Sequence, residues 1–291
     1  MSGLFADWWS RAESNRRPSH CERDALPTEL RPQILCPHPC ERAAYDSRLM
    51  PVANPLFSAK PQSPPRADFA IWVFAKTPIV GQCKTRLARQ LGNVRATRLY
   101  RAMLEHAVAR ACALAPGRVT LACSPSPRHP MFVRLAARYG VTRRRQANGP
   151  LGYRMAQGVR QALQMSDRVI LMGTDQPELE GSWLDQALAQ LRHGHSAWLA
   201  PTHDGGYWAI GLCRANARVF RGPAWSTSRV ARTTRTRALA LGLDLERLPA
   251  RRDIDEGRDW HQLSRGLRAP LARAASMPGL GAPGPSYDPG E

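Results

Sequence analysis

Two lysines in one short segment are the first candidates for chemistry. The 291-residue chain has 42 lysines and arginines, but only three are lysines, and two of these, Lys76 and Lys84, lie in "FAKTPIVGQCKTRLARQLG" (residues 74–92). Lysine carries a compact, mobile charge, whereas arginine is a planar fork. A loop that leads into a helix can present backbone N–H groups to a phosphate. The segment therefore predicts a phosphate site, and the alternative is a solvated basic loop.

Other residues of the same segment fit phosphate binding. Gly81 allows a close approach of the backbone, and Arg86 adds its charge to that of the two lysines. The segment is not a P-loop of the nucleotide-hydrolase kind, because that motif requires an earlier glycine and a Gly-Lys pair.

A carboxylate follows a second apolar run. Asp175 comes directly after "RVILMGT", which is typical of a buried strand. In open α/β sheets, ligands bind beyond the carboxyl ends of the strands. An aspartate there suits Mg²⁺ or Mn²⁺, which are held by few protein carboxylates together with substrate phosphates. The alternative is an aspartate that only stabilises a turn.

Two more acidic residues lie close together late in the chain. Asp253 and Asp255 are two positions apart in "DIDEGRDW", so they share a face if the segment is extended. Two carboxylates on one face repel each other unless a cation lies between them. The spacing therefore predicts a second part of a metal site, and the alternative is the acidic start of a helix.

The segment "HDGGYW" (203–208) places Asp204 before Gly205 and Gly206. Paired glycines permit a tight turn with positive φ. We expect a backbone surface close to a substrate, with Asp204 in contact with it; a simple hairpin turn is the alternative. Trp225 in "GPAWSTS" is a candidate for stacking on a base or sugar, or else a core residue.

The elements that must position these residues alternate along the chain. Apolar runs predict strands at 68–75, 118–124, 167–173, 197–202, 207–213 and 244–249, and helical periodicity predicts helices at 94–115, 131–140, 151–165, 182–194, 227–241 and 257–264. Such alternation is typical of an α/β domain with a mostly parallel sheet covered by helices.

The chain is expected to have one folded domain, residues 67–265. Residues 1–66 are rich in Pro, Arg and Ser and lack periodicity, so we expect disorder or a mis-assigned start, since part of this segment resembles a transfer-RNA gene translated from its opposite strand. Residues 266–291 are Pro/Gly-rich and are expected to form a disordered tail.

Composition restricts the function classes. The net charge is +19, and residues 67–265 alone have 31 basic and 14 acidic residues, which gives +17. This excess favours phosphorylated or polyanionic partners, or else an arginine-rich solvated surface, but no nucleic-acid-binding module is recognisable. No apolar run is long enough to span a membrane. The N-terminus lacks a basic start followed by an apolar block, so no secretory signal is expected. Seven irregularly spaced cysteines favour the cytoplasm.

Five motifs together resemble a known family. "FAKTPIVGQCKTRLA", "MGTDQPEL", "PTHDGGYWAIGL", "GPAWSTS" and "DIDEGRDW" occur in this order within residues 68–263. They resemble a bacterial family of uncharacterised glycosyltransferase-A-like proteins in the nucleotide-diphospho-sugar transferase superfamily, some of whose members are named arsenosugar-biosynthesis glycosyltransferases. The resemblance implies a three-layer α/β/α sandwich with a mostly parallel sheet and a nucleotide-binding half near the N-terminus.

The resemblance also implies roles for single residues. It implies a phosphate loop at Lys76, Gly81, Lys84, Thr85 and Arg86, a metal-binding Asp175, a substrate-binding segment Asp204–Tyr207, and a late acidic pair, Asp253 and Asp255, like that of cofactor nucleotidyltransferases. The chain departs from the family where an acidic pair is often found, since Pro150 and Tyr153 occupy those positions. Arg154 is retained and is expected to contact phosphate or ribose.

These observations predict a transferase that depends on Mg²⁺ or Mn²⁺ and uses a nucleotide-diphospho-sugar and a small-molecule acceptor, with Lys84, Asp175 and Asp204 as its catalytic residues. One alternative is a nucleotidyltransferase that releases pyrophosphate from a nucleoside triphosphate. Another is a non-catalytic protein that binds nucleotides or polyanions on a degenerate transferase fold. No residue stands out as the general base.

Overall fold

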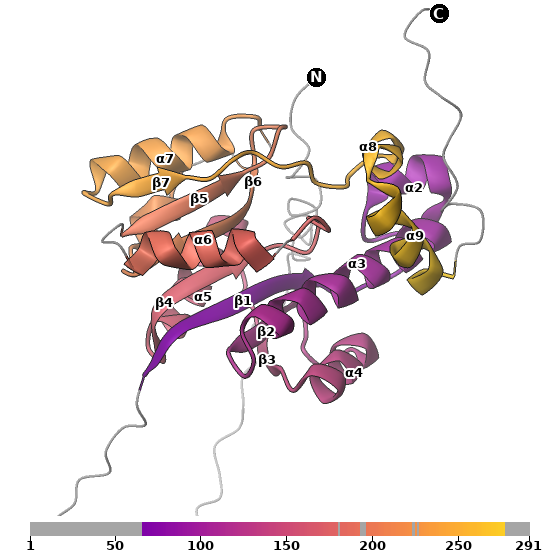
Figure 1. Cartoon of the computed structure of the whole chain (residues 1–291), viewed down its shortest axis with the longest axis horizontal. Coiled ribbons are helices and arrows are strands. Elements are labelled where there is room, and N and C mark those ends of the chain that lie inside the picture. The colour runs from indigo at the N-terminus through magenta and orange to yellow at the C-terminus, as the bar shows by residue number, and fades with distance from the viewer. Residues whose placement is uncertain (1–65, 180, 193–195, 223–224, 226, 277–291) are drawn as a thin grey trace, which may run out of the picture. The chain divides into compact units, whose positions relative to one another are not determined.

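The computed structural model describes residues 66–276, except for 180, 193–195, 223–224 and 226. The expected α/β fold is confirmed. Seven strands form one sheet in the order β3-β2-β1-β4-β6-β5-β7 (Figure 1). The strands are β1 (Ala67–Lys76), β2 (Val119–Ser124), β3 (Thr142–Arg145), β4 (Ser166–Met172), β5 (Ala197–Pro201), β6 (Tyr207–Leu212) and β7 (Leu245–Arg247). Only β6 is antiparallel to its neighbours, so the sheet is mostly parallel.

Helices cover both faces of the sheet. They are α2 (Thr85–Leu91), α3 (Asn93–Leu114), α4 (Pro130–Tyr139), α5 (Leu151–Ala162), α6 (Gly181–Arg192), η2 (Ala217–Phe220), α7 (Val230–Ala240), α8 (Gly257–Gln262) and α9 (Arg265–Ala274). Helices α3, α4 and α6 pack on one face, and α5 and α7 pack on the other (Figure 1). The three-layer sandwich expected from the sequence is therefore present.

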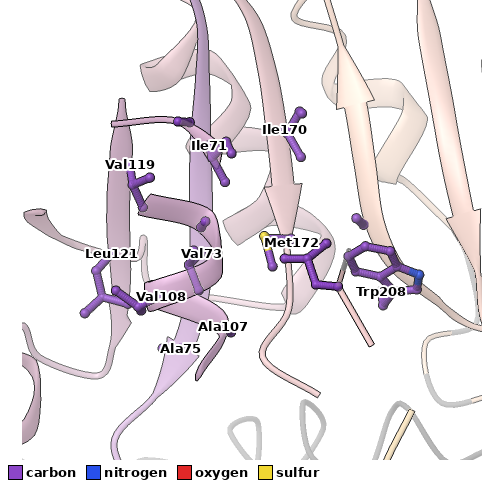
Figure 2. Close-up of a cluster of buried hydrophobic side chains, with 14 of the residues drawn as sticks. Ile71, Val73, Ala75, Ala107, Val108, Val119, Leu121, Ile170, Met172 and Trp208 are labelled. Atoms are coloured by element: carbon purple, nitrogen blue, oxygen red, sulfur yellow. The ribbon is translucent and has the colours of Figure 1, made fainter. Parts of the chain in front are cut away.

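Strand β1 is buried on both faces because it lies inside the sheet. Ile71, Val73 and Ala75 point to the face covered by α3, where Figure 2 shows them with side chains of α3, β2 and β4. Trp72 and Phe74 alternate with them and point to the face covered by α5. Complete burial of such a side chain contributes about 1.5–3 kcal/mol. This burial explains why the strand reads as a continuous apolar run rather than an alternating one.

A third hydrophobic cluster joins segments that are far apart in sequence. Leu87 of α2, Met103 of α3, Ile254, Trp260 of α8 and Leu271 of α9 pack together. Figure 1 shows α8 and α9, from the end of the described chain, beside α2. This cluster fixes the loop after β1, which contains Lys84, against the segment 253–255, which contains Asp253 and Asp255.

The structure corrects the predicted end of the domain. Residue 265 was the expected boundary, but α9 continues to Ala274, and Leu271 and Ala275 are each 3% exposed. The physical reason is that Leu267, Leu271 and Ala275 are four residues apart and form an apolar stripe on one helix face. Residues 1–65 and 277–291, the rest of the two predicted disordered segments, lie outside the described residues.

The edge strand β3 was not predicted. Its four residues, "TRRR", are all exposed. It has no apolar alternation because it lies at the edge of the sheet and pairs with β2 alone. Periodicity cannot detect such a strand.

Two further observations concern cysteines and membranes. Each cysteine of the described region, at positions 83, 112, 123 and 213, is a free thiol. Among the helices of residues 66–276, none is long and apolar enough to cross a membrane.

Candidate functional site

The acidic candidates meet at one edge of the sheet. Asp175 follows β4, and the turn with Asp204 follows β5. The segment after β7 runs alongside both: Thr202 pairs with Arg251 in a β-bridge, and the Ile254 N–H donates to the Asp175 carbonyl over 3.1 Å. Because β4, β5 and β7 are parallel, their carboxyl ends lie at the same edge. Backbone pairing at this edge thus brings together carboxylates that are up to 80 residues apart (255 − 175).

The extended segment 253–255 alternates as expected. Ile254 is 1% exposed and packs into the cluster of α2, α3, α8 and α9. Asp253 and Asp255 therefore share the opposite face. The alternative, that they form the acidic start of a helix, is wrong, because Glu256 and Asp259 form the capping box of α8. The Asp259 carboxylate accepts from the backbone N–H of Asp255 over 3.1 Å and of Glu256 over 2.8 Å.

The ammonium of Lys84 lies between two of these carboxylates. Its Nζ is 3.1 Å from Asp175 Oδ1 and 2.6 Å from Asp255 Oδ1. It also donates to the Ile254 carbonyl over 2.5 Å. The Lys84 side chain is 1% exposed. The alternative of a solvated basic loop is therefore wrong for Lys84, and the ammonium has carboxylate partners that the sequence did not reveal.

The backbone at Lys84 is unusual. This residue precedes α2 and has φ 49° and ψ 47°, the left-handed region. A residue other than glycine pays about 1–2 kcal/mol there. Such conformations persist where the surroundings over-determine them, and they cluster at functional sites. In the same loop, Gly81 has a φ of 77°, a conformation that favours glycine, while its predicted close approach to a phosphate stays a prediction.

The site has more negative charge than its one buried ammonium can balance. Burial, followed by the charges of Asp255 and Asp204, raises the pKa of Asp253. Burial also raises the pKa of Asp255, to about 6, although Lys84 opposes the shift. For Lys84, burial lowers the pKa, but Asp175 and Asp255 more than compensate, so the net shift is upward and the lysine stays charged.

Two carboxylate oxygens of the site have no hydrogen-bond partner among the described residues. They are Asp253 Oδ2 and Asp255 Oδ2, and both are buried. A buried carboxylate oxygen without a partner is costly, so a cation or a proton is expected there. Oxygen donors of this kind fit Mg²⁺ or Mn²⁺. In residues 66–276 as they stand, no three His, Cys, Asp or Glu side chains are gathered as a metal-binding group.

The turn between β5 and β6 is built around Asp204. Its carboxylate accepts from the Thr202 hydroxyl and, over 3.0 Å, from the Gly206 N–H. Gly205 has φ 89°, and a Cβ there would lie 2.0 Å from the Ser228 carbonyl oxygen. The predicted close approach at this glycine thus exists, but it is an approach to the backbone before α7. Asp204 remains close enough to raise the pKa of Asp253.

Two aromatic candidates lie in apolar surroundings. Tyr207 is 3% exposed, and its hydroxyl lies 3.8 Å from Met155 Sδ. Trp225 is half-buried and meets the Tyr207 ring edge-on, at 6.4 Å between centroids. Both line a cavity of about 20 Å³, which holds about one water. This position does not support the predicted substrate contact of Tyr207, and the cavity is too small for a base or sugar.

The remaining candidates for phosphate binding lie around the same edge of the sheet. The Lys76 ammonium donates to the Gln82 carbonyl over 2.8 Å, across the loop after β1. Thr85 and Arg86, in the first turn of α2, are half-buried. Arg154 is 5% exposed and donates to the Ser124 hydroxyl over 3.2 Å at the end of β2. Arg154 is therefore positioned near the carboxyl end of β2, and its expected contact with phosphate or ribose stays a prediction.

Sequence reasoning missed two residues that border the site. The buried Tyr100 hydroxyl accepts from the Lys76 N–H over 3.0 Å and donates to the Lys76 carbonyl over 2.9 Å, which fixes the end of β1. Nothing in the helical pattern around Tyr100 signalled this role. Gln176 is 2% exposed, and its Nε2 has no hydrogen-bond partner among the described residues. Its position directly after Asp175 could have indicated that Gln176 borders the site.

The sequence is similar to a known family. Residues 107–227 match the family described as "Uncharacterized protein conserved in bacteria (DUF2064)". This match and the structural similarity described next confirm the resemblance expected from the five motifs. No curated protein matches the chain.

One solved structure shares both sequence and fold with the chain. It is a protein from Desulfovibrio desulfuricans G20, provisionally named a nucleotide-diphospho-sugar transferase, with 27% identity and a TM-score of 0.63 over 72% of this chain and 96% of that one. The expected enzyme class, a transferase, is the class named for this relative. The fold is thus that of the nucleotide-diphospho-sugar transferases.

Two further similar structures have lower identity and lower TM-scores. A cytidylyltransferase from Leptospira borgpetersenii is 13% identical, with a TM-score of 0.47 over 76% of this chain and 100% of that one. Glucosyl-3-phosphoglycerate synthase from Mycobacterium tuberculosis, described in complex with Mn²⁺ and uridine diphosphate, is 12% identical, with a TM-score of 0.42 over 73% of this chain and 81% of that one. At these values the two structures do not decide the reaction.

Proposed function

We propose that the chain is a Mg²⁺- or Mn²⁺-dependent transferase that uses a nucleotide-diphospho-sugar as donor. The observation that carries this proposal is the buried cluster of Asp175, Asp253 and Asp255 around Lys84, with two carboxylate oxygens left without a partner. Such an uncompensated cluster is expensive for the fold, which is typical of a site kept for binding. The similarity to the Desulfovibrio protein supports a nucleotide-diphospho-sugar as its substrate class.

The residues that would hold the metal are Asp175, Asp253 and Asp255, and their carboxylates would have to come closer together than they are in the described structure. A divalent cation bound there would stabilise the charge of a diphosphate leaving group. Lys84 stays charged because its pKa is raised, so its ammonium would add positive charge near any phosphate that reaches the cluster.

Further cations support binding of the donor. Lys76, Arg86 and Arg154 lie at the same sheet edge and would contact its phosphates or ribose. Asp204 is held by its own turn, which orients the carboxylate beside Asp253 before substrate arrives. Such fixed orientation is what preorganised sites require.

The acceptor side is expected to differ from that of related proteins. Pro150 precedes α5, and Tyr153 on its first turn is 52% exposed. The acidic pair often found in the family is therefore replaced by an uncharged phenol ring and a proline at this surface. We infer an acceptor with fewer hydrogen-bonding or cationic groups at this point. Gly205 and Gly206 would form the backbone surface next to it.

Ligand-induced stabilisation tests the proposal. The thermal midpoint is measured with a panel of sugar nucleotides and nucleoside triphosphates, with Mg²⁺, with Mn²⁺ and with a chelator. We expect a metal-dependent rise with a sugar nucleotide, because a ligand that binds only the folded state stabilises it by mass action. Asp175→Asn should abolish the rise. Asp185→Asn, an exposed aspartate of α6, is the control that should leave it unchanged.

The released product then distinguishes the reactions. A nucleoside diphosphate from a sugar nucleotide supports the proposal. Pyrophosphate from a nucleoside triphosphate would replace it with nucleotidyl transfer, for which the same carboxylates and lysines would serve. Nucleotide binding that is unaffected by metal and by Asp175→Asn would leave the non-catalytic binding protein as the function.

A further inference from the structure

A groove on the outer surface of α7 has no role in the proposed reaction. Its volume is about 600 Å³, and the described residues that line it are Arg229, Arg232, Thr233, Thr236 and Arg237. They lie at i, i+3, i+4, i+7 and i+8, which is one face of a helix. The opposite face, with Val230, Thr234 and Ala238, is buried against the sheet.

Each described side chain that lines the groove is a hydrogen-bond donor. Arginine presents five N–H groups and no acceptor, and a threonine hydroxyl can donate as well. From residue 205 to residue 243 the chain has seven arginines and no aspartate or glutamate. They are Arg214, Arg218, Arg221, Arg229, Arg232, Arg235 and Arg237.

This surface differs from two other groups of arginines in the molecule. On α4, Arg134 and Arg138 share the carboxylate of Glu105, and Arg168 pairs with Asp68. Among the described residues, no ion pair involves an arginine of α7 or η2. Uncompensated positive charge in a concave surface concentrates anions. The arginines of the groove therefore keep their positive charge without a carboxylate partner among the described residues, as do those of β3.

The groove begins beside the candidate site. The Ala231 N–H donates to the Gly205 carbonyl over 2.9 Å, so the first turn of α7 rests on the turn that orients Asp204. The contact has no room for a side chain at position 205, since a Cβ there would lie 2.0 Å from the Ser228 carbonyl oxygen. An anion bound along α7 would thus extend from the side of the site formed by Asp204 and Gly205.

We propose that the α7 groove binds the multiply charged anionic part of a small ligand, a polyphosphate or a phosphorylated acceptor, separately from the donor site. Arginine is well suited to this ligand because its fork binds phosphate oxygens in pairs. The volume lies within the range of small-molecule sites. Helix α7 has 11 residues and is about 16 Å long, which suits a compact anion better than the long phosphate track of a nucleic acid. The assignment of the anion to the acceptor rests on the proposed function. The binding of an anion in the groove does not depend on that function.

Calorimetric titration with tripolyphosphate, in metal-free buffer, tests the site directly. The double variant R229Q/R232Q removes two exposed charges from the groove. R95Q/R98Q removes two exposed charges from α3 and is matched in charge and residue type. We expect R229Q/R232Q to weaken binding at least about tenfold and R95Q/R98Q to weaken it less than about twofold, because only the groove arginines contact the anion. Added salt should weaken binding to the wild type.

Three results would overturn the proposal. The first is equal weakening in both double variants, which would mean attraction to overall charge. The second is binding that survives R229Q/R232Q but is lost in Lys76→Gln, which would place the anion in the loop after β1. The third is tight binding of single-stranded nucleic acid without measurable binding of tripolyphosphate.

A further variant separates this proposal from the donor site. Asp175→Asn should retain tripolyphosphate binding while losing metal-dependent binding of the sugar nucleotide. If the donor does not bind at all but the groove binds tripolyphosphate, the proposed function fails and the anion site stands. If the donor binds and R229Q/R232Q has no effect on tripolyphosphate, the anion site fails alone.

Discussion

Lys84 is held where neither its burial nor its backbone favours it. Taking an ammonium and two carboxylates out of water costs more than their attraction commonly returns, and well-packed apolar residues would often be more stable. Its left-handed φ of 49° adds to the cost. A position with two such penalties is better explained by function than by stability. The side chain must also be unbranched and slender to reach both carboxylates with a single ammonium, which a guanidinium cannot do in the same space.

The first prediction concerns this shape requirement. Lys84→Arg keeps the charge, but the larger planar group does not fit a pocket in which the side chain is 1% exposed. We expect the affinity for the nucleotide donor, measured by titration calorimetry with Mg²⁺, to fall at least about tenfold. Arg95→Lys, a charge-conserving change at an exposed position of α3, is the control. Unchanged affinity in Lys84→Arg would remove Lys84 from the donor site.

The second prediction concerns Asp253 and pH. Its pKa is raised above its ordinary value of 3.8, so the folded state binds its proton more tightly than the unfolded state does. Well below pH 3.8 the Asp253 carboxyl is protonated in both states, so it does not reduce the free energy of unfolding. The reduction grows as pH rises through the folded-state pKa and is then constant. The wild-type protein should therefore lose stability over this rise in pH.

Asp253→Asn removes the charge and should flatten this loss. We expect the free energy of unfolding near neutral pH to increase by about 1–3 kcal/mol, as measured by urea denaturation. The same variant should lose the stabilisation that Mg²⁺ gives to the wild type, since a potential ligand is gone. A variant that is less stable at neutral pH, or equally stabilised by Mg²⁺, would contradict both expectations.

At the scale of elements, the site depends on contacts between backbones. The turn between β5 and β6 meets the start of α7 at Gly205, and the segment after β7 pairs with the loop after β4. Such contacts have little room for adjustment, since no side chain can move out of the way. The addition of a single Cβ at Gly205 should therefore disturb the site more than a larger substitution on the surface.

The third prediction uses two glycines that differ only in their surroundings. Gly205 has φ 89° and a carbonyl oxygen 2.0 Å from a would-be Cβ, whereas Gly242 has φ 71° and open space. Gly242→Ala should cost only the left-handed strain, about 1–2 kcal/mol of unfolding free energy. Gly205→Ala must also displace the backbone before α7, so we expect a loss of about 3 kcal/mol or more. Equal losses of unfolding free energy in the two variants, measured by urea denaturation, would show that the contact between Gly205 and the Ser228 carbonyl is not tight.

For the whole molecule, the structure implies a folded unit that includes α9. We propose that residues 66–276 fold by themselves, as the low periodicity of residues 1–66 suggests. The fragment 66–276 should therefore have the thermal midpoint of the full chain. The fragment 66–264 lacks α9, whose Leu271 is 3% exposed, and should be less stable by about 2–5 kcal/mol or more, the cost of emptying such a position. Equal thermal midpoints for the two fragments would mean that the folded domain ends near residue 265, as the sequence predicted.

Charge also acts at this scale. The excess of +17 in residues 67–265 is not uniform: acidic residues gather at the carboxyl ends of β4, β5 and β7, and residues 205–243 have none. The molecule thus separates a buried anionic site from an arginine surface on α7. A field of this kind would direct phosphorylated ligands toward the protein, whereas the net charge alone does not identify a partner.

The sequence by itself determined the fold class and named most of the residues of the candidate site. The apolar run of β1, the alternation of strands and helices, and the acidic residues after strands were sufficient, because periodicity and strand-end positions are local properties of the chain. They also placed Asp253 and Asp255 on one face. Edge strand β3 and helix α9 escaped prediction, because an exposed strand has no apolar alternation and the stripe of α9 was hidden in a Pro/Gly-rich context.

Only the tertiary structure decided which charges meet. Lys84 and Asp255 are 171 positions apart, and nothing local to either residue encodes their pairing at 2.6 Å. It follows from Ile254 packing against α2, α3, α8 and α9, which turns both neighbouring aspartates toward the lysine. Likewise, the burial of Tyr207 and the contact between Gly205 and the start of α7 depend on how layers stack. Spacing along the chain can propose ligands, but burial and long-range packing decide their charge balance and therefore their chemistry.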